Sequence, residues 1–534
     1  MAAFLAGQVS SIYPNAPAGS FFYGDPGVTK SFTNNPIWNF NPNFGATWDP
    51  FGNGSTVIRG GLQLAYDEAN FYTTNRNHQN PPFATNVTSP VSGPVCFSEP
   101  WLEGGTGYGC QNLTLGGTNQ SPFPQAVVPT PATAVFPAQG EWIEINNPYK
   151  VADTLQWTLS VQHEFAKGWQ AQIDYIGNKT TNMPVGTVMD PAIYTPGVWG
   201  ANGTGCGPVV TAGPPAVAAK TVGGGKVGSN CSTTGNQAAR WALSEANPAQ
   251  GNQYAGGSSN GMILVNNIAY ANYNGMVASI QHRLSSTFSM LTNFTWSRCN
   301  NLADASGDWS STPLENPYNP RADYARCGSD YSKIFNTTVV YKTAFPLHGA
   351  VKYIVNDWEI APLVHILSGA PINVTSGTDI SLTDTGNDRP NFVAGVNRKT
   401  GVKLQGGAAK ASVATRAWLN LNAFCSTTST ANPCDDPVTA GTFGDLGRNA
   451  ISGPMLIQND GQITRIFSIA EKVNLTFRLE AFNILNHPSF DNPGGSSAGN
   501  STASGPQNAT FGEISSTQAA GSARVFQGGL KVSF

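Results

Sequence analysis

Histidines and glycine-rich motifs are the first places in this chain where spacing could support chemistry. The six histidines are widely scattered: His78, His163, His282, His348, His365 and His487. His163-Glu164 has no second histidine at zinc-protease spacing, and Gly223-Gly-Gly-Lys226 lacks the spacing and the Ser or Thr of a phosphate loop. No G-x-S-x-G turn stands between a strand and a helix. We therefore predict no catalytic residues, no dedicated metal site and no enzymatic activity.

One acidic cluster leaves room for a hard cation. Asp379, Asp384 and Asp388 lie close together in a polar segment, and carboxylates with backbone carbonyls are the ligands that Ca²⁺ prefers. A solvated polar loop is the simpler interpretation of the same residues. Ca²⁺ in this loop is therefore kept as an alternative, and no other cofactor is expected.

The eight cysteines fall in local pairs, two in each of four long segments without periodicity. The pairs are Cys96 and Cys110, Cys206 and Cys231, Cys299 and Cys327, and Cys425 and Cys434. An even number in local pairs indicates disulfides formed in an oxidising compartment. Zinc binding is the alternative, but none of the pairs has the C-x₂₋₄-C spacing of zinc sites.

The composition favours strands over helices. Charged residues make up 11% of the 534 residues, and Gly (59) and Pro (37) are abundant. Such a chain is poor in helix formers and rich in turn formers, which predicts an all-β fold. The net charge of −3 argues against a nucleic-acid partner, because binding phosphates requires an excess of Lys and Arg. No run of ~20 apolar residues predicts a spanning helix, and residues 1–7 do not form a convincing signal peptide.

Several segments alternate between apolar and polar residues. In 473–482, the residues Val473, Leu475, Phe477, Leu479 and Ala481 share one face, and the polar residues between them share the other. Similar patterns run through 56–66, 155–165, 169–175, 276–284, 287–297 and 333–345. The last strand places four apolar residues on one face: Phe526, Leu530, Val532 and Phe534. Period-two alternation predicts strands with one apolar side.

The connections between these strands alternate between short and long. Short links are expected near 49–55, 166–168, 285–286, 346–356 and 470–472. Long links are expected near 68–152, 178–265, 298–331, 370–455 and 486–522. A soluble sandwich has no reason to place every long loop at one end, whereas a transmembrane barrel has short periplasmic turns and long extracellular loops. The sequence therefore predicts an antiparallel transmembrane β-barrel portion, with outer-membrane lipid around its apolar side.

About eleven strands are predicted, within an error of two. Bacterial single-chain barrels have even strand numbers, and an open edge in lipid is not viable. Residues 1–534 are therefore expected to be the C-terminal part of a barrel whose other strands lie upstream. Eleven strands would be half of a 22-stranded transporter barrel.

A family resemblance accompanies these patterns. Asn-Phe-Gly-Ala-Thr-Trp-Asp-Pro-Phe-Gly (43–52) and Val-Asn-Leu-Thr-Phe-Arg-Leu-Glu-Ala-Phe-Asn-Ile-Leu-Asn (473–486) resemble the Oar-like branch of TonB-dependent outer-membrane receptors. Further matching segments follow in family order: 368–377, 387–391, 441–449, 511–514 and 524–534. Jointly these motifs are specific, although each alone is weak.

The resemblance implies parts that residues 1–534 do not contain. Full members carry a signal peptide, a regulatory-like β-sandwich and a plug before a 22-stranded barrel. The segment that engages TonB precedes the plug, so the TonB system would be reached only through those parts. The terminal alternating strand that ends in Phe534 would be recognised by the barrel assembly machinery.

Two functions of different classes follow. The first is ligand capture and import across the bacterial outer membrane by a transport receptor, whose polar face includes Gln170, Gln172, Asp174, Arg478 and Glu480. The second is a structural or adhesive surface protein without transport. A secreted soluble β-protein ranks third, because it does not explain the alternating connections. The extracellular ligand and its binding residues are not identified by any motif.

Overall fold

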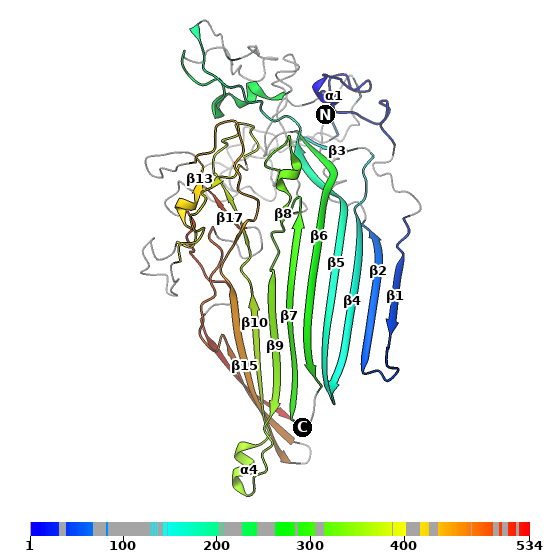
Figure 1. The fold of residues 1–534 in the computed structure, drawn as a ribbon, viewed down its shortest axis with the longest axis vertical. Coiled ribbons are helices and arrows are strands. Elements are labelled where there is room, and N and C mark those ends of the chain that lie inside the picture. Colours follow the sequence, from blue (N-terminus) through cyan, green and yellow to red (C-terminus); the bar gives the residue numbers. More distant parts are fainter. Residues whose placement is uncertain are drawn as a thin grey trace, which may run out of the picture.

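The structure, a computed structural model, describes most of the strands and part of the loops. The described residues are 2–30, 39–67, 142–146, 148–201, 227–242, 262–283, 287–304, 314–386, 388–401, 417–426, 436–470, 473–494, 501–504, 511–518 and 523–534, with a few isolated positions. Long strands run side by side along the longest axis of the molecule (Figure 1). The loops and the N-terminus lie at one end of these strands, and helix α4 (Ala350–Val355) and the C-terminus lie at the other. No described helix is long and apolar enough to cross a bilayer.

Eleven strands form one continuous path in the main sheet. In path order they are β1 (Asn43–Trp48), β2 (Thr56–Tyr66), β4 (Asp153–Ala166), β5 (Trp169–Val188), β6 (Met262–His282), β7 (Phe288–Asn301), β9 (Lys333–Lys342), β10 (Trp358–Leu367), β15 (Leu456–Ala470), β16 (Val473–Phe482) and β18 (Val525–Ser533). Every neighbouring pair in this path is antiparallel. The predicted all-β fold and the predicted strand number are confirmed.

Two short strands extend the sheet near the loop end. Strand β3 (Trp142–Ile145) pairs in parallel with β6, and β8 (Ala325–Arg326) pairs with β7 just beyond the end of β9. Among the described residues, β1 and β18 each pair with one neighbour only, so the sheet has two free edges.

The register divides the side chains of the whole sheet between two faces, because directly opposed residues of antiparallel strands point to the same side. One face, which we call the apolar face, includes Phe44, Leu62, Trp157, Leu159, Ile173, Tyr175, Ala278, Phe294, Phe335, Ile360, Ile463, Phe477 and Leu530. The other, which we call the polar face, includes Thr47, Arg59, Gln162, Gln172, Ser279, Asn293, Asn336, His365, Gln458, Arg478 and Lys531. The apolar and polar residues that alternate within each strand therefore form two continuous surfaces across the sheet.

Charge on the apolar face is confined to its two ends. In the eleven strands of the path, its charged side chains are Asp153, Lys179, Arg298 and Lys333 near the loop end, and Arg465 near the opposite end. The middle of this face carries no Asp, Glu, Lys or Arg in those strands. An uncharged apolar band bounded by charges is what a barrel wall in a bilayer requires.

The connections follow the predicted alternation. The short links are 49–55, 167–168, 283–287, 343–357 and 471–472, and the long ones are 67–152, 189–261, 302–332, 368–455 and 483–524. Strands β2 and β16 have the predicted bounds. Asp49 closes the first short link, because its carboxylate accepts hydrogen bonds from the backbone N–H groups of Phe51, Gly52 and Gly54.

Two strands are longer than predicted. Residues 178–188 and 262–265 were expected to be loop, but they complete β5 and β6, which pair across register shifts at Met183. Cys299 was expected in a loop and instead lies near the end of β7. Both differences arise because the pairing continues beyond the segment in which side chains alternate.

The loop end has a small core of its own. Strands β11 (Pro371–Thr375), β14 (Ile451–Ser452) and β17 (Ser501–Ser504) form a second sheet, and β12 (Asn391–Phe392) pairs with β13 (Phe424–Cys425). A buried cluster packs between them: Ile372, Val374, Leu419, Ala423, Phe424, Leu446, Ile451 and Phe511. Short helices are α1 (Ala2–Leu5), η2 (Thr234–Arg240), η3 (Pro320–Asp323) and η4 (Leu421–Ala423). The described parts of the long loops therefore include packed structure.

Helix α4 is fastened to the sheet at the opposite end. Arg465 stacks on the rings of Trp358 and Phe467. Its guanidinium donates hydrogen bonds to the backbone oxygens of Tyr353 and Ile354, the latter at 2.9 Å. A cation at the C-terminus of a helix is favourably placed, so two guanidinium nitrogens of Arg465 are hydrogen-bonded although the residue lies on the apolar face.

Candidate functional site

The polar face is the first candidate surface. All five residues predicted to line the interior lie on it: Gln170, Gln172, Asp174, Arg478 and Glu480. Their side chains bond to one another along the wall. Gln172 Nε2 donates to Asp174 Oδ1 at 2.8 Å, and Arg478 Nη2 donates to Gln462 Oε1 at 2.7 Å. Such a wall suits an aqueous interior or the packing of another polar domain, and it offers no nucleophile with an adjacent base.

Three of the histidines lie in strands of the sheet. His365 lies on the polar face and bonds to Asn336, which in turn donates to Asn293 at 3.0 Å. His163 and His282 lie on the apolar face beside the short links, where they contact Thr56 and Phe288. All three histidines are therefore part of the wall that the main sheet forms.

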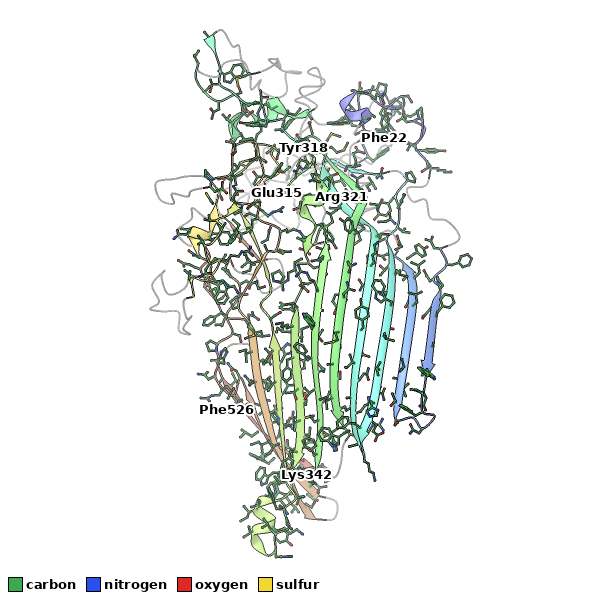
Figure 2. All side chains as sticks on the ribbon, viewed as in Figure 1. Phe22, Glu315, Tyr318, Arg321, Lys342 and Phe526 are labelled. Carbon is green, nitrogen blue, oxygen red and sulfur yellow. A yellow bond between two sulfur atoms is a disulfide. The ribbon has the colours of Figure 1, made fainter. Side chains whose placement is uncertain are left out.

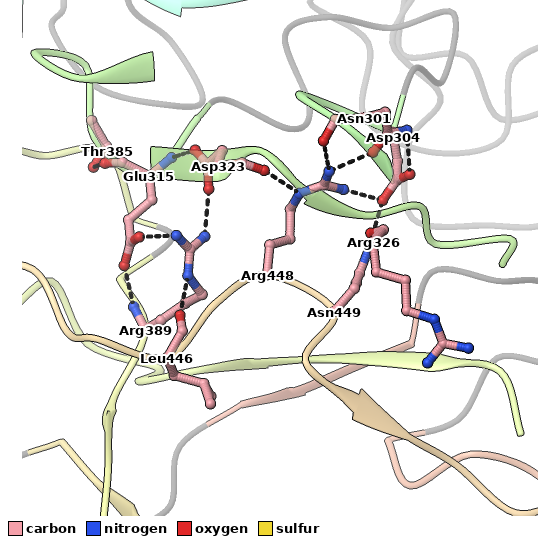
Figure 3. Close-up of polar contacts among 10 residues, drawn as sticks. All are labelled: Asn301, Asp304, Glu315, Asp323, Arg326, Thr385, Arg389, Leu446, Arg448 and Asn449. Carbon is pink, nitrogen blue, oxygen red and sulfur yellow. Dashed lines mark hydrogen bonds and ion pairs between the residues drawn. The ribbon is translucent and has the colours of Figure 1, made fainter. Parts of the chain in front are cut away.

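The second candidate is a network of buried charges that joins two extracellular-type loops, 302–332 and 368–455. Figure 3 shows the guanidinium of Arg389 between Glu315 and Asp323. Its Nη1 is 2.5 Å from Asp323 Oδ1, its Nε donates to Leu446 O at 2.8 Å, and its backbone N–H donates to Glu315 Oε1 at 2.6 Å. The side chains of Arg389, Glu315 and Asp323 are 5%, 2% and 2% exposed. This arginine therefore fixes both loops in one arrangement.

A second arginine continues the network. Arg448 forms an ion pair with Asp304 and donates to the backbone oxygens of Asn301 and Asp323, at 2.8 Å and 3.2 Å. Asn449 Nδ2 donates to Asp304 Oδ2 at 2.9 Å. The same segment is thus bonded to the end of β7 and to the loop that follows it. We call this set, Glu315, Asp323, Arg389, Asp304 and Arg448, the loop lock.

A glycine makes the close packing of the lock possible. A Cβ at Gly444 would lie 2.1 Å from the backbone oxygen of Arg389 and 2.6 Å from that of Pro390. Only a residue without a side chain can let the two backbones approach so closely. Gly444 therefore allows its own backbone to pack against the backbone of Arg389.

Burial shifts the protonation of the lock. Burial raises the pKa of Glu315 to about 7, although the neighbouring Arg389 opposes the shift. Buried carboxylates are costly to ionise unless they are paired and hydrogen-bonded. The lock therefore titrates in the physiological range.

Disulfides brace the same end of the molecule. Cys206 pairs with Cys231, and Cys299 pairs with Cys327, whose backbone N–H also donates to Cys299 O at 3.0 Å. Cys425 is disulfide-bonded as well. Cys96, Cys110 and Cys434 lie outside the described residues. Both described bridges join cysteines of a predicted pair.

The structure does not gather the predicted calcium ligands. Asp379 accepts hydrogen bonds from the backbone N–H groups of Thr383 and Asp384, and Asp388 accepts from that of Ser381. Asp384 accepts from the indole N–H of Trp241 at 3.2 Å. Within the described ranges, no group of three His, Cys, Asp or Glu residues could hold a metal ion. Protein donors already bond to all three carboxylates, so this geometry gives the Ca²⁺ alternative no support.

The closing strand β18 has the predicted orientation. Leu530 opposes Phe477, and Phe526 opposes Ala481, so both lie on the apolar face. Phe526, Leu530, Val532 and Phe534 are 59%, 73%, 56% and 98% exposed. Figure 2 places Phe526 toward the end of the molecule that carries Lys342 and α4, far from Glu315 and Tyr318. Recognition of this strand by the assembly machinery stays a prediction.

The loop lock was not predicted from the sequence, although a signal for it existed. Arg389 belongs to the motif at 387–391 and Arg448 to the motif at 441–449, two of the segments that carry the resemblance described above. Their partners lie far away in the sequence, 74 residues in the case of Glu315. The motifs singled out the segments that contain the two arginines, but they did not indicate which carboxylates the arginines contact.

Comparisons with known proteins agree with this architecture. A model of one protein family, described as outer membrane beta barrel domain, matches residues 3–527. No curated protein matches the chain at a significant level.

Several solved structures are similar to this chain at low sequence identity. The outer membrane transporter YddB of Escherichia coli is 8% identical with a TM-score of 0.36, over 92% of this chain and 40% of that one. The FrpB iron transporter of Neisseria meningitidis is 8% identical with a TM-score of 0.35, over 92% and 39%. A mutant of the ferric enterobactin receptor of Pseudomonas aeruginosa is 11% identical with a TM-score of 0.35, over 93% and 40%. The present chain therefore spans about 40% of the length of these solved chains.

The family match covers almost the whole chain, and the apolar face of the antiparallel sheet has the uncharged middle band that a bilayer requires. This chain belongs to the outer membrane beta barrel domain family and is located in the bacterial outer membrane.

Proposed function

We propose that this chain forms half of the barrel of an energy-coupled transporter of the TonB-dependent receptor class, in its Oar-like branch. One observation carries the proposal: eleven strands share an apolar and a polar face, and the sheet is open at β1 and β18. A strand edge cannot stay unpaired in hydrocarbon. Further strands must close the sheet, and doubling eleven gives the 22 strands of large outer-membrane transporters. The motifs at 43–52 and 473–486 support this class.

The proposed mechanism is physical. Extracellular loops held by the loop lock capture the ligand, and a plug domain blocks the interior until an inner-membrane energy source displaces it. The polar face, with Gln172, Asp174 and Arg478, lines the path or holds the plug. No residue of this chain needs to make or break a covalent bond.

A second function is favoured by the bracing of the loops. Buried ion pairs hold loops 302–332 and 368–455 to each other, and a disulfide ties loop 302–332 to the end of β7. Rigid loops of this kind also suit an adhesive surface protein, because preorganised contacts lose less conformational entropy on binding. In that case nothing is imported, and no plug or TonB contact is needed.

A capture experiment separates the two functions. The native protein would be extracted from the outer membrane in mild detergent and passed over the immobilised periplasmic domain of the organism's own TonB. A porin from the same extract serves as the control. We expect the receptor to be retained and the porin to flow through.

Retention would support transport. If the protein flows through with the porin although it remains folded by heat-resistant gel mobility, the transport proposal fails and the adhesive function is favoured.

A further inference from the structure

The apolar face carries a band of cations just beyond its aromatic edge. Tyr175 and Trp296 are 41% and 61% exposed and lie level with each other through Met276. Exposed aromatic rings of this kind mark the boundary between hydrocarbon and headgroups. Arg298 follows Trp296 by two residues, which places it ~7 Å further along the strand. Arg298 therefore lies at the level of the lipid headgroups on the loop side.

Two more cations share this band. Lys333 opposes Trp296, and Lys179 opposes Asn272, which opposes Asn300. Lys179, Arg298 and Lys333 are all exposed. In the part of the chain that the structure describes, none of the three has a carboxylate within ion-pair distance. The nearby acids are engaged: Asp330 pairs with Arg326, and Asp153 accepts from Thr181 and Asn182. The band is therefore open to anions.

Two clefts lie within this band and meet at Tyr324. The first, of about 530 Å³, is lined by Lys179, Asn182, Asn267, Tyr270, Asn272 and Tyr324, among others. The second, of about 630 Å³, is lined by Tyr324, Arg298, Asn300, Arg326 and Ser332, among others. The rings of Tyr270 and Tyr324 stack at 4.8 Å between centroids. Amides, aromatic rings and cations together match the hydroxyls and phosphates of a sugar headgroup.

We propose that these clefts bind the phosphorylated sugar headgroup of a glycolipid in the outer leaflet of the outer membrane. The occupant follows from the position: Lys179 and Asn272 in the first cleft, and Arg298 and Asn300 in the second, belong to the apolar face, whose adjoining band is embedded in lipid. Charge complementarity supplies the attraction, because basic residues near an anionic lipid surface each strengthen binding. The acyl chains would lie along Tyr175, Ile173 and Trp296. This inference does not depend on whether the protein transports a ligand.

Co-purification of glycolipid tests the proposal. The complete native protein would carry Lys179→Gln, Arg298→Gln and Lys333→Gln together. A matched control would carry Arg59→Gln, Lys342→Gln and Lys531→Gln, three cations of the polar face. After detergent extraction and size-exclusion chromatography, glycolipid phosphate would be measured per protein in molecules with heat-resistant gel mobility.

We expect wild type and control to retain glycolipid, and the triple variant to bind it much more weakly, by about fivefold for each cation removed. Tyr324→Ala, which changes no charge, should also lower retention because the cleft loses its ring. Equal retention in all proteins, or an equal loss in the control, would overturn the proposal. Wild-type retention by Tyr324→Ala would overturn the assignment to these clefts.

A second measurement separates a lipid site from a free-phosphate site. Purified lipopolysaccharide and inorganic phosphate would be added at equal phosphorus concentration, and the thermal unfolding midpoint recorded. Only the glycolipid should raise the midpoint, and only in wild type and control. An equal rise with inorganic phosphate would mean an anion site unrelated to lipid and would contradict the proposal.

Discussion

At the residue scale, two arginines organise the loop end of the molecule. Arg389 and Arg448 lie in separate motifs, and each contacts a carboxylate from loop 302–332. Removing one partner of a buried ion pair leaves the other charge uncompensated, which costs more than the pair contributes. The loop lock is therefore sensitive to single substitutions in a way that exposed charges of the same loops are not.

Replacing Arg389 tests this sensitivity. Arg389→Met would leave Glu315 and Asp323 buried without their cation and should destabilise the docked loops by about 3–5 kcal/mol. Hydrogen exchange in segments 314–326 and 441–452 would report the loss, while β4 and β5 should stay protected. Arg321→Met, at an exposed arginine of the same loop, is the control. Unchanged exchange in the Arg389 variant would show that the lock does not hold the loops.

The lock should also respond to pH. The folded-state pKa of Glu315, about 7, lies above the 4.5 of a free glutamate. Its contribution to docking is therefore complete below pH 4.5 and is lost as pH rises through about 7, by at most about 3 kcal/mol. Protection factors of segment 314–326 should fall between pH 5 and pH 8 and stay flatter in Glu315→Gln. A wild-type profile as flat as that of the variant would contradict the assignment.

These contacts lay beyond sequence reasoning for a physical reason. Arg448 and Asn301 are 147 residues apart, and nothing local to either residue encodes the partner. Alternation in the sequence indicates which face of a strand a residue occupies. Ion pairs between loops depend instead on which distant segments the tertiary fold brings together. For the same reason, spacing alone could not show that Asp379, Asp384 and Asp388 bond to protein donors such as Ser381, whose hydroxyl donates to both Asp379 and Asp388.

At the element scale, each strand has one side for lipid and one side for the interior. Alternation was enough to predict β2 and β16 with their bounds, because their side chains change environment at every residue. It failed for 178–188, where Asn182 has a positive φ of 56° and the register shifts at Met183. It also failed for 262–265, where Met262, Ile263 and Val265 are all buried, so that an unbroken apolar run replaced alternation.

Neighbouring residues of β4 provide a matched test of the two faces. Leu159 lies on the apolar face and Thr158 on the polar face, and both are exposed in the sheet. Leu159→Arg should destabilise the folded barrel in lipid by about 2–4 kcal/mol, whereas Thr158→Arg should cost little. Denaturant unfolding of the full protein in lipid vesicles would measure the difference. Equal destabilisation by the two variants would contradict the assigned faces.

At the scale of the whole molecule, the free edges of β1 and β18 require partners. Exposed strand edges pair readily with other strands. In lipid no water is present to hydrogen-bond the unpaired backbone N–H and C=O groups of such an edge. In the proposed function, the main sheet is a segment of a larger closed wall.

An immunoblot of the native outer membrane tests this requirement. An antibody against residues 523–534 should detect a band near twice the 56.2 kDa of this chain, because one polypeptide then supplies all the strands. A 56 kDa band in that fraction would instead mean closure by a second chain. Detection only in the soluble fraction would contradict the membrane-spanning sheet.

The strict alternation of short and long connections has a consequence for how the barrel assembles. Each short link joins two strands that pair with each other, so β1–β2, β4–β5, β6–β7, β9–β10 and β15–β16 are five β-hairpins. The contacts within each are local in sequence and form quickly. The entropy lost in closing a loop grows only with the logarithm of its length, so docking one hairpin on the next costs little more across a long connection than across a moderate one. The wall can therefore be added two strands at a time, and insertions in the long loops can diversify the outer surface without slowing its construction.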